Sequence, residues 1–159
     1  MTSTKYWIEK LDMKPHPEGG YYCESFKSPS QITSPEGNVR STATSIYYLL
    51  EASDQSHFHK LGADEVWYFH TGDSADIHFI TPEGKYYVER IGPADHLQVV
   101  IPKGHLFGAT LPEGSSYILV GCMVAPGFEF EDFELVPKAE LLRNYPQHQQ
   151  IIEQLSISK

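Results

Sequence analysis

The stretch EVWYFHTGDSADIHFITPEGKYYVERI, residues 65–91, contains three runs of aromatic and β-branched residues, which two turn sequences separate. Residues of these types favour β-strands. In TPEGK the proline presets φ for the first central position of a turn, and the glycine two residues later can adopt a positive φ. We therefore expect strands joined by tight turns, with a hairpin around residues 82–84.

The same pattern covers most of the chain. Further runs of this kind are YYCESFK (21–27), STATSIYYLL (41–50), LQVVI (97–101), YILVGCMV (117–124) and FEFEDFEL (128–135). The last run changes phase at Asp132, so a bulge there would keep Phe128, Phe130, Phe133 and Leu135 against the core. Many short strands in a single domain, residues 1–159, predict an all-β sandwich or small barrel, whose mouth can hold a ligand.

The triplet Pro-Glu-Gly occurs four times, at residues 17–19, 35–37, 82–84 and 112–114. The segments between the copies share no other period. The triplets therefore indicate recurring hairpin turns rather than tandem repeats.

Helices are expected only at the two ends of the chain. Trp7, Ile8 and Leu11 fall on one face of a predicted helix over residues 3–13. Two further helices are predicted over about 138–156, where Pro137 suits a first helical turn. Their apolar stripe consists of Ile151, Ile152 and Leu155. These helices are expected to pack on a barrel that spans about residues 20–136.

Charge and composition exclude several classes of function. The net charge of −9 argues against binding of nucleic acid or of anionic membranes, since both require a basic surface. The N-terminus has no apolar segment typical of a signal peptide, and no apolar run reaches the roughly 20 residues of a membrane span. Cys23 and Cys122 lie in apolar runs and are expected to be buried thiols. We expect a cytoplasmic protein.

The stretch SHFHKLGADEVWYF, residues 56–69, contains a candidate metal site. His57 and His59 are two apart, so both would project from one face of a strand. A hairpin through KLGAD would bring Glu65 beside them, on the face that carries Trp67. Two imidazoles and one carboxylate can hold Fe(II), Mn, Ni or Zn and leave positions open for a substrate. The alternative is a strand that carries imidazoles without a metal.

Tyr22 and Glu24 share one face of the strand that follows HPEGG. If this strand lines the barrel, burial would raise the pKa of Glu24 and suit it to acid or base catalysis. If it is an edge strand, Glu24 lies in solvent.

The motifs HPEGGYY (16–22), DEVWYFHTGD (64–73), VVIPKG (99–104) and APGFEFEDFEL (125–135) resemble the cupin superfamily, and within it the cupin-5 or DUF985 family. The resemblance runs from about residue 11 to residue 135. It implies a double-stranded β-helix barrel, usually a homodimer, with no settled activity.

The resemblance also bears on the site. The histidine of the family's first motif corresponds to His59, and its acidic pair to Asp64 and Glu65; the strand phase shared with Trp67 favours Glu65. Phe107 stands where the last metal ligand of the superfamily's second motif is expected. The resemblance therefore implies an incomplete four-ligand metal site.

Three functions remain open. The first is a metal-independent epimerase or isomerase of a sugar or nucleotide-sugar, with His59 as base and Glu24 or Tyr22 as acid. Glu65, Trp67 and Phe107 would then contact the substrate. The second is a metal-dependent oxygenase or isomerase that uses the candidate metal site. The third is a non-catalytic module that binds a small ligand.

Overall fold

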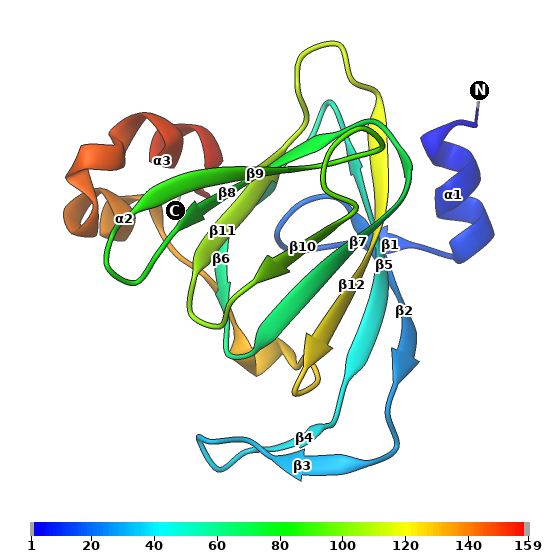
Figure 1. Ribbon diagram of the computed structural model, residues 1–159, viewed down its shortest axis with the longest axis horizontal. Coiled ribbons are helices and arrows are strands. Elements are labelled where there is room, and N and C mark those ends of the chain that lie inside the picture. The colour runs from blue at the N-terminus through cyan, green and yellow to red at the C-terminus, as the bar shows by residue number, and fades with distance from the viewer. Residues whose placement is uncertain (1, 158–159) are drawn as a thin grey trace.

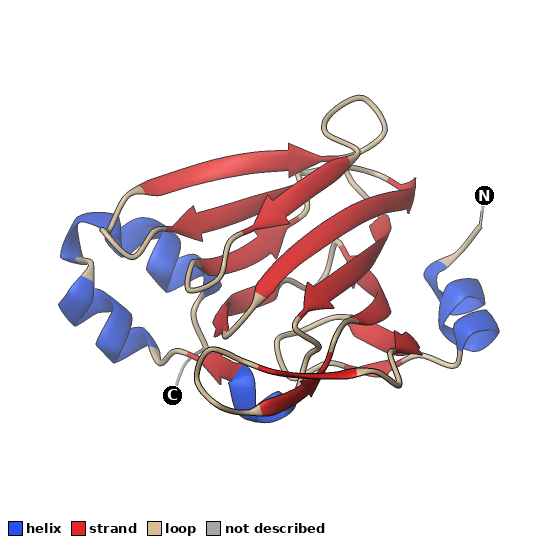
Figure 2. Ribbon diagram, turned by 60° about the horizontal axis from the view of Figure 1, so that its bottom comes forward, coloured by secondary structure: helices blue, strands red, loops and turns tan. Residues whose placement is uncertain are grey.

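The computed structural model describes residues 2–157 and contains two antiparallel β-sheets that face each other (Figures 1 and 2). Short helices flank the sheets at opposite ends, with α1 on one side and α2 and α3 on the other. The architecture confirms the predicted all-β barrel of the double-stranded β-helix type with helices at the termini.

The strands are divided between the sheets as follows. The larger sheet has the order β1 (Lys14–Pro15), β2 (Tyr21–Lys27), β5 (Thr44–Glu51), β12 (Tyr117–Ala125), β7 (Asp64–Gly72) and β10 (Gln98–Ile101). The smaller sheet has the order β13 (Phe133–Leu135), β6 (Ser56–Leu61), β11 (Leu106–Thr110), β8 (Ala75–Ile80) and β9 (Tyr86–Ile91). A separate ribbon of β3 (Gln31–Thr33) and β4 (Val39–Ser41) extends from the barrel, at the bottom of Figure 1.

Strands β6 and β7 lie in opposite sheets, which corrects the predicted hairpin between them. β6 pairs with β11 and β13, whereas β7 pairs with β12 and β10. The KLGAD segment therefore crosses from one sheet to the other. As a result, residues of β6 and β7 meet across the barrel interior instead of lying side by side.

Three of the four Pro-Glu-Gly triplets lie in hairpins. Residues 17–19 connect β1 to β2, residues 35–37 connect β3 to β4, and residues 82–84 connect β8 to β9. The fourth, residues 112–114, connects β11 to β12, which belong to different sheets. The hairpin prediction is therefore wrong for that copy.

The main core fills the space between the sheets. It contains buried apolar side chains from both, among them Tyr48, Trp67 and Val120 of the larger sheet and Phe79 and Phe107 of the smaller sheet. Burial of side chains this large is worth about 1.5–3 kcal/mol each. The core therefore stabilises the contact of the two sheets.

The terminal helices cover the outside of the barrel. In α1 (Thr4–Leu11) the Ser3 hydroxyl accepts from the Tyr6 N–H, and the predicted stripe of Trp7, Ile8 and Leu11 packs on a second apolar cluster. Helix α2 (Lys138–Asn144), a 3-10 turn η2 (Pro146–His148) and helix α3 (Gln149–Leu155) follow the barrel, and the predicted stripe of α3 is buried. None of the helices within residues 2–157 is long and apolar enough to cross a membrane.

The segment FEFEDFEL is not a bulged strand as predicted. Residues Phe130–Asp132 form a 3-10 turn, η1, and only Phe133–Leu135 form strand β13. The 3-10 turn accounts for the change at Asp132 in the alternation of apolar and polar residues. Phe128 and Phe133 pack against the main core, but Phe130 is 49% exposed.

Candidate active site

A cavity of about 500 Å³ lies at one end of the barrel, between the two sheets. It is lined from the end of α1, from β1 and the loop before β2, from strands β2, β5, β6, β7 and β12, and from the segment that contains η1 and the start of β13. The lining residues central to its chemistry are His16, Glu18, Tyr22, His59, Glu65 and Cys122, with Phe128, Phe130 and Phe133. Its size suits a small metabolite.

The loop His-Pro-Glu-Gly-Gly, residues 16–20, places two of these side chains inside the barrel. Both glycines have positive φ, 114° at Gly19 and 73° at Gly20. A Cβ atom at Gly19 would overlap the backbone oxygen of Gln55, and one at Gly20 would lie 2.6 Å from the oxygen of Leu49. Only glycine permits both the backbone conformation and this close approach, so the pair lets the loop fold against the barrel wall.

Further hydrogen bonds hold this loop in place. The Tyr48 hydroxyl donates to the Gly19 carbonyl at 2.7 Å, and the Gly20 N–H donates to the Asp54 carboxylate at 2.8 Å. The His57 N–H donates to the Glu18 carbonyl at 2.7 Å. The turn is therefore anchored to residues 29 to 39 positions away in the sequence.

Glu18 forms a buried ion pair with His59. Its side chain is 8% exposed, and its Oε2 lies 2.7 Å from His59 Nε2. The same oxygen accepts a hydrogen bond from the Ser56 hydroxyl at 3.0 Å. Burial alone would raise the pKa of Glu18, but the charge and hydrogen bond of His59 outweigh burial and hold the pKa below its ordinary value.

His59 is the cationic member of this pair. Its Nδ1 lies 2.7 Å from the backbone carbonyl of His57, which can only accept, so Nδ1 carries a proton. Its Nε2 faces the ionised Glu18 and carries the second proton. Burial would lower the pKa of His59, but the Glu18 charge raises it above its ordinary value. Because both ring nitrogens are occupied, His59 is a poor candidate for the base.

A β-bulge in β6 explains why His57 does not accompany His59 into the cavity. Phe107 pairs with His59 and Ala109 pairs with Ser56. These pairs are two residues apart on β11 but three residues apart on β6. The extra residue changes the phase of the strand. Ser56 and His59 therefore both reach Glu18, whereas the His57 Nδ1 bonds the Glu18 backbone carbonyl and its side chain does not line the cavity.

Glu65 enters the cavity from β7, in the opposite sheet. It is 7% exposed, and its Oε1 accepts a hydrogen bond from Trp67 Nε1 at 3.1 Å. Its Oε2 is buried, and none of residues 2–157 forms a hydrogen bond with it. Burial, together with the nearby Glu18 charge, raises the pKa of Glu65 to about 7. Asp64 instead is exposed and accepts from the Lys103 N–H, so Glu65 is the member of the acidic pair that faces the cavity.

His16 supplies a neutral imidazole. Its Nδ1 accepts a hydrogen bond from the Glu18 N–H at 3.1 Å, so the neutral ring carries its proton on Nε2. Burial lowers its pKa more strongly than Glu18 raises it. The ring packs edge-on against Tyr22, with the ring centroids 4.8 Å apart.

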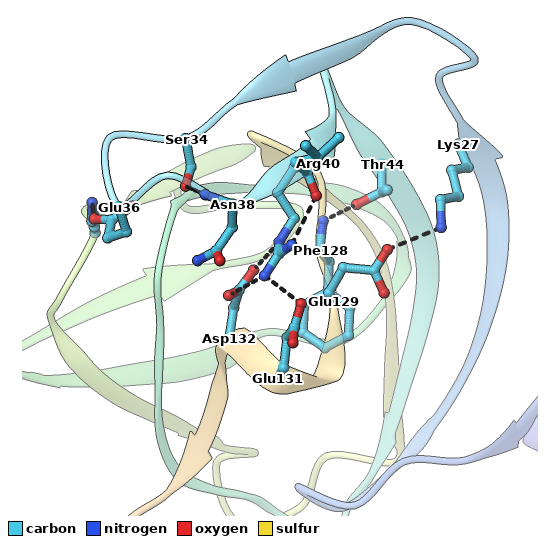
Figure 3. A network of polar contacts seen from close by, with 12 residues as sticks. Lys27, Ser34, Glu36, Asn38, Arg40, Thr44, Phe128, Glu129, Glu131 and Asp132 are labelled. Carbon is cyan, nitrogen blue, oxygen red and sulfur yellow. Dashed lines mark hydrogen bonds and ion pairs between the residues drawn. The ribbon is translucent and has the colours of Figure 1, made fainter.

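The segment 126–133 brings three phenylalanine rings to the cavity, and ion pairs hold this segment against the barrel (Figure 3). The buried Arg40 guanidinium donates to both oxygens of Asp132 at 2.7 and 2.9 Å and pairs with Glu131 at 2.6 Å. Lys27 pairs with Glu129 at 3.1 Å. These contacts connect the segment to β2 and β4.

The phenylalanines form a continuous aromatic wall. Phe128 packs edge-on against Phe130 with ring centroids 5.0 Å apart, and Phe133 lies 5.6 Å from His16 and 5.2 Å from His59. The Phe128 N–H donates to the Thr44 hydroxyl at 2.9 Å (Figure 3). The cavity thus combines buried polar side chains with an aromatic wall.

The other predicted site residues take different places. Tyr22 lines the cavity and is half-buried, and Glu24 lines it from an exposed position at the rim. Trp67 and Phe107 are each 1% exposed and do not line the cavity. They lie in the core behind it, where Trp67 holds Glu65 and the Phe107 ring lies 4.1 Å from that of His59.

Of the three predicted metal ligands, only His59 and Glu65 share the cavity. Among residues 2–157, no group of three His, Cys, Asp or Glu side chains is arranged to hold a metal ion. His57 lies outside the cavity, and both nitrogens of His59 are engaged by protein oxygens. The residues present therefore do not fit the metal site that His57, His59 and Glu65 were predicted to form.

Sequence reasoning missed Glu18, His16 and Ser56. HPEGGYY was singled out for its resemblance, but its Pro-Glu-Gly was interpreted as one of four equivalent turns. The second glycine, directly after the triplet, distinguishes this copy from the other three. Two consecutive glycines indicate a backbone under close packing, so this signal could have pointed to an enclosed loop.

A barrel of two facing antiparallel sheets with a polar cavity at one end defines a cupin-type protein. The family described as "Cupin superfamily (DUF985)" matches residues 5–136. The chain belongs to this family. A search of curated proteins found no match.

Solved structures agree with this assignment. A protein from Shewanella oneidensis is 40% identical, with a TM-score of 0.91 and full coverage of both chains. A protein from Leishmania major is 35% identical, with a TM-score of 0.94 over 99% of this chain and 100% of its own. Oxalate decarboxylase from Bacillus subtilis is 17% identical, with a TM-score of 0.58 over 93% of this chain and 38% of its own, and shares the fold alone.

Proposed function

We propose that the protein binds a small polar molecule in the cavity and transfers a proton to or from it through Glu65, as an isomerase or epimerase does. The observation that carries this proposal is the Glu65 carboxyl, which is buried at the cavity wall and has one oxygen without a hydrogen-bond partner among the described residues. A pKa of about 7 allows such a group to act as acid and as base near neutral pH.

The Glu18–His59 pair supports this role of Glu65. The Glu18 charge is one cause of the raised pKa of Glu65, and His59 partly opposes it. Because the pair is locked by hydrogen bonds at both ends, it provides a fixed electrostatic environment. The assignment differs from the sequence-based one, in which His59 was the base and Glu24 or Tyr22 the acid.

The charges of the cavity favour an unphosphorylated ligand over a nucleotide-sugar. Phosphate groups are usually held by arginine, lysine or helix N-termini. Among the described lining residues the cationic side chains are Lys14, which is exposed, and His59, which Glu18 already neutralises. No arginine of the described chain lines the cavity.

Ligand-observed NMR in D₂O tests the proposal. The protein is mixed with unphosphorylated sugars, hydroxy acids and amino compounds, and both binding and replacement of carbon-bound hydrogen by deuterium are measured. We expect exchange for at least one bound compound, and a loss of about 100-fold or more in its rate at saturating ligand in Glu65→Gln. Glu113→Gln, in an exposed Pro-Glu-Gly turn, serves as the control with unchanged exchange.

The outcomes separate the remaining functions. Exchange that persists in Glu65→Gln contradicts the role of this carboxyl. Binding without exchange of any compound favours the non-catalytic binding module instead. Binding that persists in Ile46→Trp, which places an indole in the cavity lining, contradicts the assignment of the cavity as the binding site.

The homodimer and the cytoplasmic location stay predictions. Light scattering during gel filtration would test the first, and fractionation of the source cells would test the second.

A further inference from the structure

In the part of the chain that the structure describes, one oxygen of the Glu65 carboxyl has no hydrogen-bond partner. Trp67 donates to Oε1, and the remaining oxygen is buried without a hydrogen-bond partner. The Cys122 thiol lies close to this carboxyl, but a thiol is a weak donor. A buried polar atom left unpaired costs about 1–3 kcal/mol, so a ligand that pairs with it would recover that free energy.

Neither of the two cavity histidines, His59 and His16, offers an unpaired positive charge to Glu65. The His59 imidazolium donates to Glu18 and to a backbone carbonyl, so it has no proton left for Glu65. The His16 ring is neutral and uses its Nδ1 to accept from the backbone. Glu65 is therefore a second buried carboxyl, beside the first, for which the described protein supplies no cation.

Acidic side chains also outnumber basic ones around the cavity. Its lining contains Asp12, Glu18, Glu24 and Glu65, against Lys14 and His59. With His59 and Glu18 neutralising each other, the remaining groups are three carboxyls and one ammonium. The field in the cavity therefore favours a positively charged ligand.

Aromatic rings complete the surroundings. Tyr22, Phe128, Phe130 and Phe133 line the same cavity as these carboxyls. The negative face of an aromatic ring attracts cations, and a carboxylate among several rings is a typical receptor for ammonium groups. The wall also favours burial of the apolar part of such a ligand.

We infer that the ligand carries an ammonium group, which pairs with the free oxygen of Glu65 while the aromatic wall surrounds it. The inference rests on the proposed function insofar as both use the same cavity. It adds the chemical class of the ligand, an amine or a quaternary ammonium compound.

Binding of a cation should release a proton from Glu65. The groups that face this carboxyl are Glu18 from the loop, His59 from β6, Cys122 from β12 and Trp67 on its own strand. With a pKa of about 7, Glu65 is mostly protonated at pH 6, and a bound cation favours its ionised form. Affinity for a cation should therefore rise by up to about tenfold per pH unit between pH 5 and 7 and level off above.

Matched pairs of probes test the inference by calorimetry. Choline is compared with its uncharged isostere, in which a tert-butyl group replaces trimethylammonium, and ethanolammonium with 1-propanol. We expect at least one ammonium compound to bind about tenfold or more tightly than its isostere at pH 8. Titration at pH 6 in two buffers of different ionisation enthalpy should show release of about one proton per bound cation.

Glu65→Gln should bring the two members of each pair to similar affinity and remove the pH dependence. Glu113→Gln should behave as the wild type. If the Gln variant does not fold, the pH dependence of the wild type decides the question.

Equal or tighter binding of the isosteres, affinity that falls as pH rises, or failure of both ammonium probes to bind overturns the inference. Isosteres that bind in the wild type at least as tightly as the ammonium compounds, and that do not bind in Ile46→Trp, would overturn it and leave the proposed function standing. If no compound shows proton exchange but the ammonium compounds show the expected preference, the proposed function is contradicted and the inference about the ligand stands.

Discussion

The four Pro-Glu-Gly turns share a sequence but differ in their surroundings. Their glycines all have positive φ, 114° at Gly19, 89° at Gly37, 88° at Gly84 and 86° at Gly114. Glu18 is 6% exposed, whereas Glu36, Glu83 and Glu113 are exposed. The same local conformation thus places a glutamate in the barrel at one position and in solvent at three.

The difference lies in what surrounds each turn. A Cβ atom at Gly19 would overlap Gln55, but one at Gly37 or Gly114 would meet nothing within 4 Å. Glu18 is bonded by Ser56 and His59, which approach from β6 in the other sheet. The residue types of the turn therefore determine the conformation of these loops, whereas residues distant in the sequence determine whether the glutamate is buried and paired.

The largest expected effect is that of Glu18→Ala. Removal of this carboxylate leaves the His59 charge buried and unpaired, which typically costs about 3–5 kcal/mol. Glu113→Ala, the same change in an exposed turn, should alter the free energy of unfolding by no more than about 0.5 kcal/mol. Urea unfolding of both variants measures the difference. Equal effects at the two positions would contradict the ion pair.

Substitution of the turn glycines should separate two contributions to the loss of stability, the cost of a positive φ and the cost of steric overlap. Gly19→Ala and Gly114→Ala both place a side chain at positive φ, at a cost of about 1–2 kcal/mol. Only Gly19→Ala also makes the new side chain overlap Gln55, which should destabilise the protein by about 1–3 kcal/mol more. Thermal unfolding should therefore show the larger loss at Gly19. A loss that is larger at Gly114 would show that the first turn is not enclosed.

The pH dependence of stability should report the combined effect of burial and of the nearby Glu18 on the pKa of Glu65. Its pKa rises from 4.5 to about 7 on folding, so the folded state binds this proton more tightly than the unfolded state. The contribution is fully present below pH 4.5 and is lost as pH rises to about 7, a change of up to about 3 kcal/mol.

Glu65→Gln should remove this loss. The difference between wild type and variant, measured by urea unfolding from pH 4.5 to 8, isolates Glu65 from the contributions of Glu18 and His59. Glu113→Gln is the control and should follow the wild-type profile. Parallel profiles of wild type and Glu65→Gln would show that the carboxyl titrates normally.

The smallest effect should come from the hydrogen bond that anchors the enclosed turn. Tyr48→Phe removes the bond to the Gly19 carbonyl and should cost about 1 kcal/mol. Tyr6→Phe removes a hydroxyl from a side chain that is 45% exposed and should change stability by less than about 0.5 kcal/mol. Denaturant unfolding would again compare the two, and a Tyr48→Phe variant as stable as Tyr6→Phe would count against this anchor.

Much of the fold could be predicted because its signals are local. Alternating residues identified the strands, Pro-Glu-Gly identified tight turns, and apolar stripes identified the terminal helices. The shared phase of Glu65 and Trp67 was also visible, and their hydrogen bond agrees with it. Each of these features depends on residues within a few positions of one another.

The site was harder to predict because a bulge and a sheet crossing intervene. One extra residue in β6 turns His57 away from His59, and no residue type in SHFH indicates it. The KLGAD segment has the composition of a hairpin, yet it joins the two sheets. Neither pairing partner is near in sequence, so periodicity alone could not reveal them.

By itself, the sequence determined the strand pattern, the positive φ of the turn glycines and the charge of the chain, since these follow from residue type and spacing. Only the tertiary structure decided that Glu18 is buried against His59, that His57 lies outside the cavity and that Oε2 of Glu65 has no hydrogen-bond partner among residues 2–157. The physical reason is that burial and pairing depend on side chains from opposite sheets, which approach only when the barrel closes.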